Sequence, residues 1–238
     1  MLAAARNADR LLGVDFSYRR TAALEAIRDL VRADALGRVV ALDLTFHNAY
    51  GPDKPWFYDA ALSGGGCMMD LGCHLVDAAL WLLGHPPVER VEAMLFTAGA
   101  PARAGQVEDL AFATLHFAGN RVARIACSWN LHAGADAEIS VRVLGTEGGA
   151  TMRNIGGSFL DFETVLARGT HSEHLTVPPD EWSGRMAADW ARQLAIRPGF
   201  DPEAEGLVAV SEAIDRIYRA GSNRSNSVPS QPLDQASA

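Results

Sequence analysis

The sequence has 238 residues, of which 48% are hydrophobic and 21% are charged, and its net charge at pH 7 is −8. This composition is ordinary for a globular protein, and the length predicts one large domain or one domain with a fragment of a second. No basic excess is present that could neutralise phosphates, which argues against a sequence-independent nucleic-acid binder.

Cysteine usage and apolar runs narrow the class of protein further. The three cysteines, Cys67, Cys73 and Cys127, form no CxxC pair, so we predict neither a disulfide framework nor a zinc site. No uninterrupted apolar run reaches the roughly 18 residues of a membrane span, and the first residues lack the apolar core of a secretory signal. We therefore expect a cytoplasmic protein without metal, membrane or nucleic-acid partners.

The chain opens with a predicted helix, strand and helix. Residues 1–10 favour a short helix, and the apolar run Leu11–Arg19 favours a strand. Thr21 can then cap a second helix that ends near Leu36. This order is that of the end of a βαβ array. Without neighbouring strands, residues 1–20 would present an exposed apolar edge, so we expect this segment to be poorly soluble.

Residues 38–50 and the loop after them come next. β-branched and aromatic residues with partial alternation predict a strand over residues 38–50. The following loop carries Trp56, Phe57 and Tyr58 shortly before three glycines. These rings could stack on a ligand ring or pin the loop to the body of the protein, and the sequence leaves both open.

The stretch Gly64–Gly84 carries the densest set of polar groups in an apolar setting. Its apolar residues recur at helical spacing, and Asp70, His74 and Asp77 are spaced to stack along one side of a helix. An imidazole between two carboxylates suits acid–base chemistry, although the same pattern is common in an ordinary polar stripe. The three glycines permit close approach by a ligand or another chain segment, and equally suit a tight turn.

Gly84, which two prolines follow closely, predicts the end of the preceding helix. Most of the remaining chain is predicted to be strands, with a hairpin turn at Gly119-Asn120. They are expected at residues 88–98, 108–118, 121–132, 137–145, 149–156 and, more weakly, 159–169, with helices at 182–195 and 202–220. Consecutive strands with few helices between them predict an α+β fold, with a large, mainly antiparallel sheet covered by helices on one face. The polar tail from Gly221 is predicted to be disordered.

Other motifs carry weaker signals. The segment VRVLGTEGGATM is not G-x-G-x-x-G and is followed by a strand pattern, so it predicts a hairpin turn. The sequence HSEH at 171–174 predicts a solvated loop. Period-two alternation would place Asn130 and His132 on one face, opposite Trp129, where they could line a polar pocket or form the exposed face of the sheet.

Several segments together resemble one enzyme family. GGGCMMDLGCHLVDAALWLLG resembles the GGG-x-x-x-D-x-G-x-H-x-x-D signature of the Gfo/Idh/MocA oxidoreductases. LLGVDFSYRR resembles the last strand of the family's Rossmann domain, and LGRVVALDLTF resembles the first strand of its second domain. The resemblance implies a Rossmann remnant at residues 1–20, a C-terminal α+β substrate and oligomerisation domain at 21–220, and a disordered tail at 221–238.

The resemblance also implies roles for individual residues. His74 would exchange the hydroxyl proton of a sugar, cyclitol or related polyol, Asp70 would orient the substrate or tune His74, and Asp77 would support the site. From the aromatic loop and the strand alternation described above, substrate contacts are expected at Trp56, Tyr58, Asn130 and His132. Contacts with an NAD or NADP cofactor are expected at Tyr18, Arg19, Gly65 and Gly66.

The sequence also departs from the family. The G-x-G-x-x-G loop and the E-K-P motif are absent, and Trp56 is followed by Phe57 where many members have Arg. We therefore expect the substrate-binding and catalytic C-terminal portion of an NAD(P)-dependent oxidoreductase, inactive alone and forming a homo-oligomer through the open sheet face. The alternative is a non-catalytic module of that family that oligomerises or binds carbohydrate.

Overall fold

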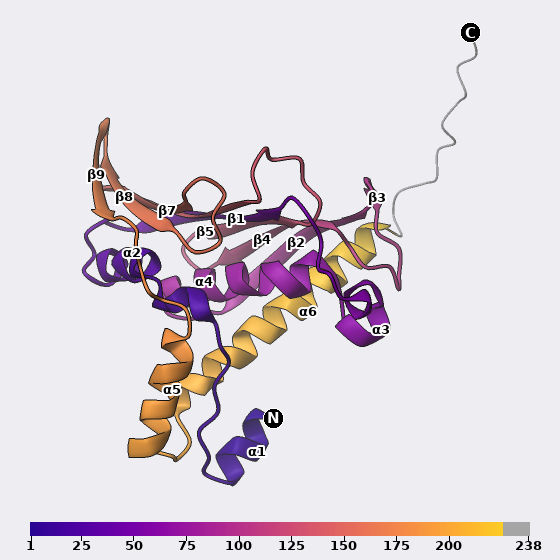
Figure 1. Cartoon of the computed structure of the whole chain (residues 1–238), viewed down its shortest axis with the longest axis horizontal. Helices are drawn as coiled ribbons and strands as arrows, with labels where there is room; N and C mark the ends of the chain where they lie inside the picture. The colour runs from indigo at the N-terminus through magenta and orange to yellow at the C-terminus, as the bar shows by residue number, and fades with distance from the viewer. Residues whose placement is uncertain (226–238) are drawn as a thin grey trace.

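The computed structural model describes residues 1–225 and is built on a single sheet (Figure 1). In the described part of the chain, nine strands follow the order β3-β2-β4-β5-β1-β6-β7-β8-β9. Neighbouring strands pair antiparallel, except β1 and β5, which run parallel. The strands are β1 (Val39–Asn48), β2 (Val88–Thr97), β3 (Ala100–Pro101), β4 (Leu110–Phe117), β5 (Arg121–Ser128), β6 (Ala137–Gly145), β7 (Gly149–Asn154), β8 (Phe162–Arg168) and β9 (His171–Thr176). The predicted α+β fold is confirmed.

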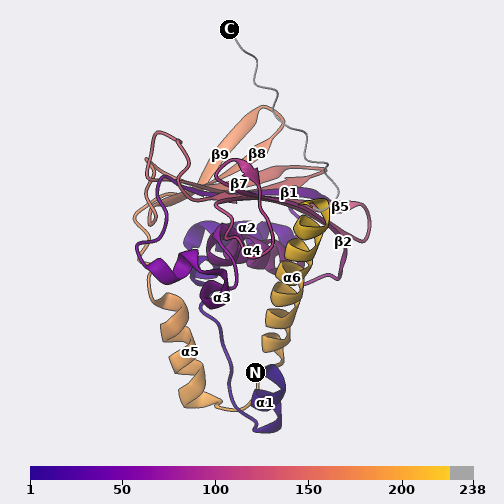
Figure 2. The same cartoon turned by 90° about the vertical axis from the view of Figure 1, so that its right-hand side faces the viewer.

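Alternation along the strands gives the sheet one covered and one open face. In β1, Leu42, Leu44 and Phe46 are at most 4% exposed, and Asp43 and Thr45 between them point to the other side. Helices α2 (Ala22–Arg32), α4 (Cys73–Leu83) and α6 (Gly206–Ser225) lie along the covered face (Figures 1 and 2). No helix of the described chain covers the opposite face.

Helix α4 forms the centre of the core. Its apolar side chains are buried almost all round, and Asp77 is a buried polar residue among them, 2% exposed. The helix ends at Gly84, which has φ of +75°, as the sequence predicts. The helical stretch Ala60–Leu83 is long and apolar enough to cross a membrane, but 72% of its apolar window is buried inside the protein, as in a core helix.

The predicted strand at Leu11–Arg19 is wrong. Helix α1 (Leu2–Asn7) is followed by an irregular segment over residues 11–16 and by a 3-10 turn, η1 (Ser17–Arg20). A strand needs a neighbour for its backbone hydrogen bonds, and here the Leu11 N–H donates to the Pro198 carbonyl at 2.8 Å. The Phe16 side chain is buried in the core instead.

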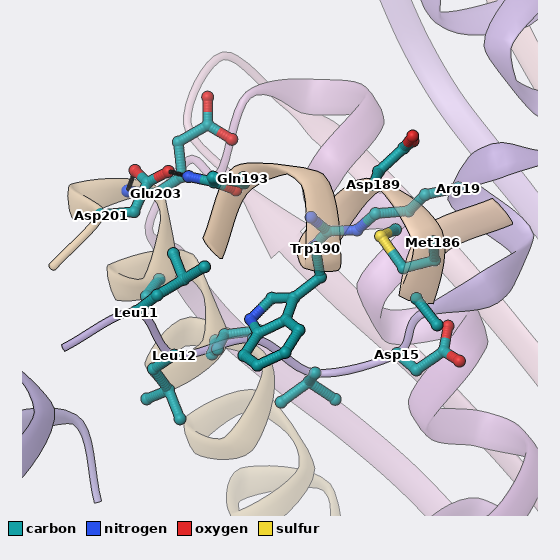
Figure 3. Close-up of a pocket in the computed structure, with 15 residues that line it drawn as sticks. Leu11, Leu12, Asp15, Arg19, Met186, Asp189, Trp190, Gln193, Asp201 and Glu203 are labelled. Carbon is teal, nitrogen blue, oxygen red and sulfur yellow. Dashed lines mark hydrogen bonds between the residues drawn. The ribbon is translucent and has the colours of Figure 1, made fainter. Parts of the chain in front are cut away.

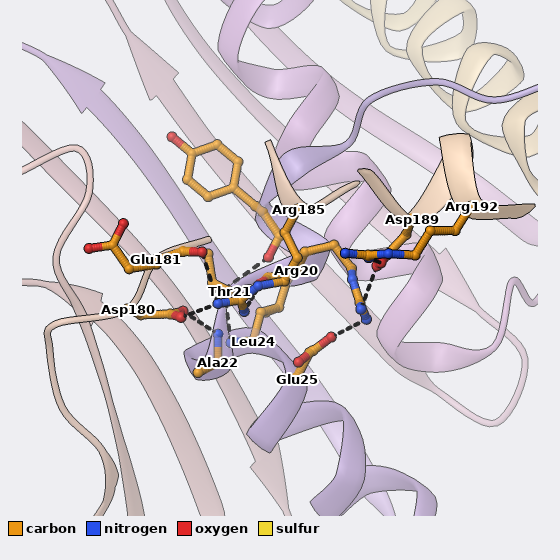
Figure 4. Close-up of polar contacts among 11 residues, drawn as sticks. Arg20, Thr21, Ala22, Leu24, Glu25, Asp180, Glu181, Arg185, Asp189 and Arg192 are labelled. Atoms are coloured by element: carbon orange, nitrogen blue, oxygen red, sulfur yellow. Dashed lines mark hydrogen bonds and ion pairs between the residues drawn. The ribbon is translucent and has the colours of Figure 1, made fainter. Parts of the chain in front are cut away.

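A polar network fastens this N-terminal segment to the rest of the protein (Figure 4). The Thr21 hydroxyl accepts from Leu24 N–H at 3.1 Å and donates to the Tyr18 carbonyl at 2.9 Å, which confirms the predicted cap of α2. Asp180 accepts from Ala22 N–H at 2.6 Å and pairs with Arg185 at 2.7 Å. Arg185 begins helix α5 (Arg185–Ile196), so the start of α2 and the start of α5 are tied together.

Two further predictions differ from the structure. The polar segment at 171–174 is strand β9 rather than a loop, and His174 Nδ1 lies 3.0 Å from Glu163 Oε2 on the adjacent strand β8. The disordered tail does not begin at Gly221, because α6 continues to Ser225 and Gly221 packs closely on Leu95. The rest of the predicted tail, residues 226–238, lies outside the described residues.

Replacing the Thr21 cap should lower stability. The Thr21→Val variant keeps the shape of the side chain but removes both hydrogen bonds, and we expect a loss of about 1–2 kcal/mol in the free energy of unfolding. Urea denaturation followed by circular dichroism measures this loss. The Thr21→Ser variant retains the hydroxyl and should lose less, and equal losses in the two variants would contradict the capping role.

Candidate functional site

The glycine turn brings the chain into close contact with itself. Gly64 ends the short helix α3 (Ala60–Ser63) with φ of +78°. A Cβ atom on Gly65 would lie 2.0 Å from the Tyr218 hydroxyl oxygen, and one on Gly66 would lie 1.9 Å from the Glu108 carbonyl oxygen. The sequence left open whether these glycines admit a ligand or another chain segment. In the structure, the neighbours are the chain's own residues.

A π-helical turn over Met68–Gly72 carries Asp70 and leads directly into α4. Single π turns inside helices are rare overall, and those that occur are often found at functional sites. Gly72 fits here because a Cβ would lie 2.3 Å from Met68 Sδ. The predicted stacking of Asp70 and His74 assumed a continuous α-helix, whereas the structure has a π turn before α4. Asp70 lies on the π turn, and His74 lies on α4.

Asp77 is paired with Arg19. The Arg19 guanidinium donates to both carboxylate oxygens of Asp77, with a distance of 2.8 Å from Nε to Oδ2. Burial raises the pKa of the Asp77 carboxyl, and the bond to Arg19 opposes this rise. A buried pair of this kind ties η1 to α4, which agrees with the supporting role predicted for Asp77.

His74 lies beneath aromatic rings of the N-terminal segment. Phe16 and Tyr18 meet the imidazole edge-on, with ring centroids 6.1 and 5.3 Å away. The buried Nδ1 atom has no hydrogen-bond partner among the described residues. Burial lowers the pKa of His74, and the charge of Asp15 acts in the opposite direction. The imidazole is therefore neutral at neutral pH, which is the form that can accept a proton.

Asp70 is held by a residue that the sequence analysis did not assign to the site. The Trp129 indole Nε1–H donates to Asp70 Oδ2 at 3.1 Å, and Trp129 is 3% exposed. Burial raises the pKa of the Asp70 carboxyl, and this hydrogen bond opposes the rise. Because Asp70 is bonded to Trp129 and Asp77 to Arg19, no hydrogen bond in the described chain joins either carboxylate to the His74 imidazole.

The aromatic loop lies beside Trp129. Trp56 and Phe57, in the turn η2 (Pro55–Tyr58), are stacked with centroids 3.8 Å apart. The rings of Phe57 and Tyr58 meet Trp129 edge-on, at 6.3 and 5.7 Å. The contact of Phe57 with Trp129 fits the alternative in which the rings pin the loop to the body. Trp56 is 47% exposed and Tyr58 52% exposed, so stacking of these two rings on a ligand stays a prediction.

Asn130 and His132 do not continue the alternation that was predicted for this strand. Strand β5 ends at Ser128, and Asn130 has φ of +59°, so period-two alternation stops before both residues. Both are exposed. Asn130 Nδ2 and the Tyr58 hydroxyl both lie close to Gly51, at 3.6 and 2.2 Å from the position of a Cβ there, which brings Asn130 to the aromatic loop. His132 makes no contact that would place it with Asp70 in the described chain.

The four residues predicted to touch a dinucleotide cofactor are engaged within the chain. Arg19 is bound to Asp77, and Tyr18 packs against Phe46, Phe162 and Trp182. The Gly66 N–H donates to the Glu108 carboxylate, and Gly65 packs under Tyr218. In this arrangement these residues do not fit NAD or NADP, because the Arg19 guanidinium and the Gly65 and Gly66 N–H groups are already bonded within the chain and the Tyr18 ring is packed against other rings.

A separate cavity of about 320 Å³ lies between residues 11–15, α5 and the start of α6 (Figure 3). Trp190 forms one wall and packs against Gly13, where a Cβ would lie 2.7 Å from its ring. The remaining polar wall is mostly acidic and includes Asp15, Asp189, Asp201 and Glu203. Neither Asp70 nor His74 lines this cavity, so it is distinct from the candidate site.

Comparison with known proteins places this geometry in a family. Residues 24–151, more than half of the chain, match the model described as the GFO/IDH/MocA C-terminal domain. The chain belongs to the Gfo/Idh/MocA family. The matched residues include the glycine turn, the π turn, α4 and Trp129, so the observed site lies within the family's C-terminal domain.

Similar proteins of this family include named sugar oxidoreductases. D-glucoside 3-dehydrogenase of Escherichia coli K12 is 29% identical over 160 residues, covering 62% of this chain and 46% of that protein. 1,5-Anhydro-D-fructose reductase of Ensifer adhaerens is 31% identical over 157 residues, covering 65% and 45% respectively. The crystal structure of GenD2 from gentamicin A biosynthesis, in complex with NAD, has a TM-score of 0.74 and 25% identity over 94% of this chain and 65% of that chain. This chain thus spans about half the length of the curated relatives it matches.

The burial of His74 predicts a pH-dependent stability. Since its folded pKa is lowered below the ordinary 6.5, the unfolded state binds the proton more readily, and stability should fall as pH drops from about 6.5 towards the folded pKa. The His74→Leu variant should lose part of this slope in urea denaturation between pH 7 and pH 5, where wild type and variant are compared directly.

The Phe16→Ala variant gives a matched control for the pH effect. It leaves the imidazole in place but opens it to water, so the slope should also become shallower. A His74→Leu variant with the same pH dependence as the wild type would contradict the assignment of this slope to His74.

Proposed function

We propose that this chain is the substrate-binding and catalytic C-terminal portion of an NAD(P)-dependent oxidoreductase that acts on a sugar or related polyol. The observation that carries the proposal is the placement of Asp70. Its carboxylate accepts the indole N–H of Trp129, and the Trp129 ring in turn contacts Tyr58 of the aromatic loop, in which Tyr58 and Trp56 are both exposed. A carboxylate next to open aromatic surface suits a ligand with hydroxyl groups on one edge and an apolar C–H face.

The relatives support the same substrate class. Their names specify a D-glucoside 3-dehydrogenase and a 1,5-anhydro-D-fructose reductase, both of which act on sugar rings. In the proposed reaction, NAD or NADP held by a cofactor-binding fold would accept or donate the hydride. His74 would accept the hydroxyl proton during oxidation or return it during reduction once the covering segment is displaced, and Asp70 would accept a hydrogen bond from a sugar hydroxyl.

We further propose that residues 1–238 do not bind the cofactor productively by themselves. Tyr18, Arg19, Gly65 and Gly66 have partners within the chain, and the His74 imidazole is covered by Phe16 and Tyr18. A complete site therefore requires a cofactor-binding fold and a displacement of the covering segment. The division at residues 1–20 and 21–220 remains the proposed domain organisation.

A second candidate function is favoured by the covered His74. If the N-terminal segment stays in place, the chain can bind carbohydrate at the aromatic loop without taking part in proton transfer. This is the non-catalytic module of the sequence analysis. The two functions predict the same sugar contact but differ in whether His74 matters for activity once a cofactor-binding fold is present.

A self-association surface accompanies both candidates. On the open sheet face, Met94 and Phe112 are 44% and 39% exposed and are register partners on neighbouring strands. We propose that a second copy of this chain covers this face. The Phe112→Asp variant should shift the mass measured by sedimentation velocity towards the monomer, whereas Trp190→Asp, on another surface, should leave it unchanged. A wild-type monomer at high concentration would contradict this assignment.

Sugar binding by the isolated chain tests the substrate assignment. We expect saturation-transfer NMR to detect binding of methyl β-D-glucoside, and the Trp56→Ala variant to weaken its affinity about three- to tenfold through the lost ring contact. Trp190→Ala removes a tryptophan of similar exposure from the separate cavity and serves as the control. Equal weakening by both variants would contradict a sugar site at the aromatic loop.

Cofactor dependence separates the two candidate functions. Titration of the isolated chain with NADH should show neither tight binding nor turnover of the sugar. If upstream coding sequence supplies an in-frame G-x-G-x-x-G loop and E-K-P motif, the extended chain should become active. His74→Ala should then lower its kcat about 100-fold, the usual scale for an acid–base group. Turnover by the extended chain that is insensitive to His74→Ala would contradict the catalytic assignment.

A further inference from the structure

Glu108 is a buried carboxylate that no cation neutralises in the described chain. Its side chain is almost wholly buried, with 1% of the residue exposed. The carboxylate accepts hydrogen bonds from the Gly66 and Met68 N–H groups, each at 3.0 Å, and from the Tyr218 hydroxyl at 2.8 Å. Burying a carboxylate is costly unless such donors replace water. The Glu108 carboxylate therefore depends on the N–H groups that the glycine turn supplies.

The same residue holds the turn through its backbone. Cys67 N–H donates to the Glu108 carbonyl at 2.9 Å. Any side chain at Gly66 would collide with this carbonyl, which explains why glycine is needed at that position. Residues 66–68 therefore wrap around Glu108 with three successive N–H groups. The π turn starts at Met68, and the Asp70 N–H donates to the Gly66 carbonyl at 3.0 Å. The hydrogen bonds of residues 66–68 to Glu108 thereby also fix the backbone of Asp70.

A second connection reaches Asp70 from its side chain. Asp109, the next residue, accepts the Trp129 N–H on its carbonyl at 2.8 Å and donates its own N–H to Phe96 on β2 at 2.9 Å. Trp129 then donates its indole N–H to Asp70. Hydrogen bonds to Glu108 and Asp109, which directly precede β4, thus fix both the backbone of Asp70 and, through Trp129, its carboxylate. Asp109 is itself bonded to β2 of the sheet.

We propose that Glu108 is the positioning residue of the candidate site, setting the place and the protonation of Asp70 through the glycine turn, while the neighbouring Asp109 holds Trp129 against the Asp70 carboxylate. The importance of Glu108 for sugar binding rests on the proposed function, in which Asp70 contacts the sugar. The physical linkage between Glu108 and Asp70 can be tested without sugar or cofactor.

The Glu108→Gln variant is the direct test. Glutamine has the same shape but replaces one acceptor oxygen by an NH₂ group. Because the Gly66 N–H lies 3.0 Å from both carboxylate oxygens, it faces this NH₂ group in either orientation of the amide, which weakens its hydrogen bond. In ¹⁵N-labelled wild-type protein, the Trp129 indole resonance, assigned with the Trp129→Phe variant, should follow the ionisation of Asp70 as pH is changed. In Glu108→Gln we expect the midpoint of that titration to move or the titration to disappear. Glu173→Gln, on the exposed edge strand β9, should leave it unchanged.

Amide hydrogen exchange distinguishes local positioning from general destabilisation. In Glu108→Gln, exchange at Gly66 and at Asp70, which is bonded to the Gly66 carbonyl, should accelerate at least tenfold, while amides of β6 and β7 keep their wild-type rates. If Glu108→Gln does not fold, Tyr218→Phe decides the question, because it removes one donor to the same carboxylate and should move the Trp129 titration in the same direction by a smaller amount. An unchanged Trp129 titration in Glu108→Gln, or in Tyr218→Phe where that variant is decisive, overturns the proposal.

Failure of the positioning role and failure of the proposed function give different results. A protein that binds no sugar but whose Trp129 titration depends on Glu108 retains the positioning role and loses the proposed function. A protein that binds methyl β-D-glucoside with a Trp129 titration independent of Glu108 retains the proposed function and loses the positioning role. When both hold, Glu108→Gln should weaken the sugar affinity without altering the ring contact that Trp56→Ala removes.

Discussion

The structure depends on burying helix α4 almost completely between the sheet and the other helices. In such surroundings every polar group of the helix needs a partner or must remain uncharged. Asp77 meets this condition through Arg19, and that pairing draws η1 down onto the helix. His74 meets it by remaining neutral beneath Phe16 and Tyr18. The Arg19–Asp77 pair therefore also holds Phe16 and Tyr18, its neighbours in sequence, over the His74 imidazole.

The sequence predicted those parts of the fold that local rules determine. The cap at Thr21, the turn at Gly119 and Asn120, and the helix stop at Gly84 all depend on residues whose side chains or φ angles act locally. The strand predicted at Leu11–Arg19 failed because a strand exists only with a neighbour, and its pattern carries no information on whether that neighbour is present. Strand β9 was missed for the complementary reason, since pairing with β8 makes a strand of a polar segment.

The candidate site was predictable in its residue types but not in its contacts. The family resemblance pointed to Asp70 and His74, but the spacing of apolar residues predicted a continuous α-helix and did not reveal the π turn that carries Asp70. The sequence did not assign Trp129 and Glu108 to the site, because their roles depend on hydrogen bonds to residues 59 and 42 positions away in the sequence. One signal was present, since three consecutive glycines ahead of a helix indicate a close approach, and the approaching residue is Glu108.

The single parallel pairing of the sheet explains why the site's loops meet. Strands β1 and β5 point the same way, with His47 opposite Ser128, so the segments that leave them emerge at one end. The aromatic loop leaves β1, and Trp129 and Asn130 leave β5, with the Leu131 N–H bonded to the Asn48 carbonyl at 2.9 Å. Loops mounted on a common strand end can change length and composition without disturbing the pairing beneath them. The composition of these two loops can therefore change while the pairing of β1 with β5, and with it the stability of the sheet, is kept.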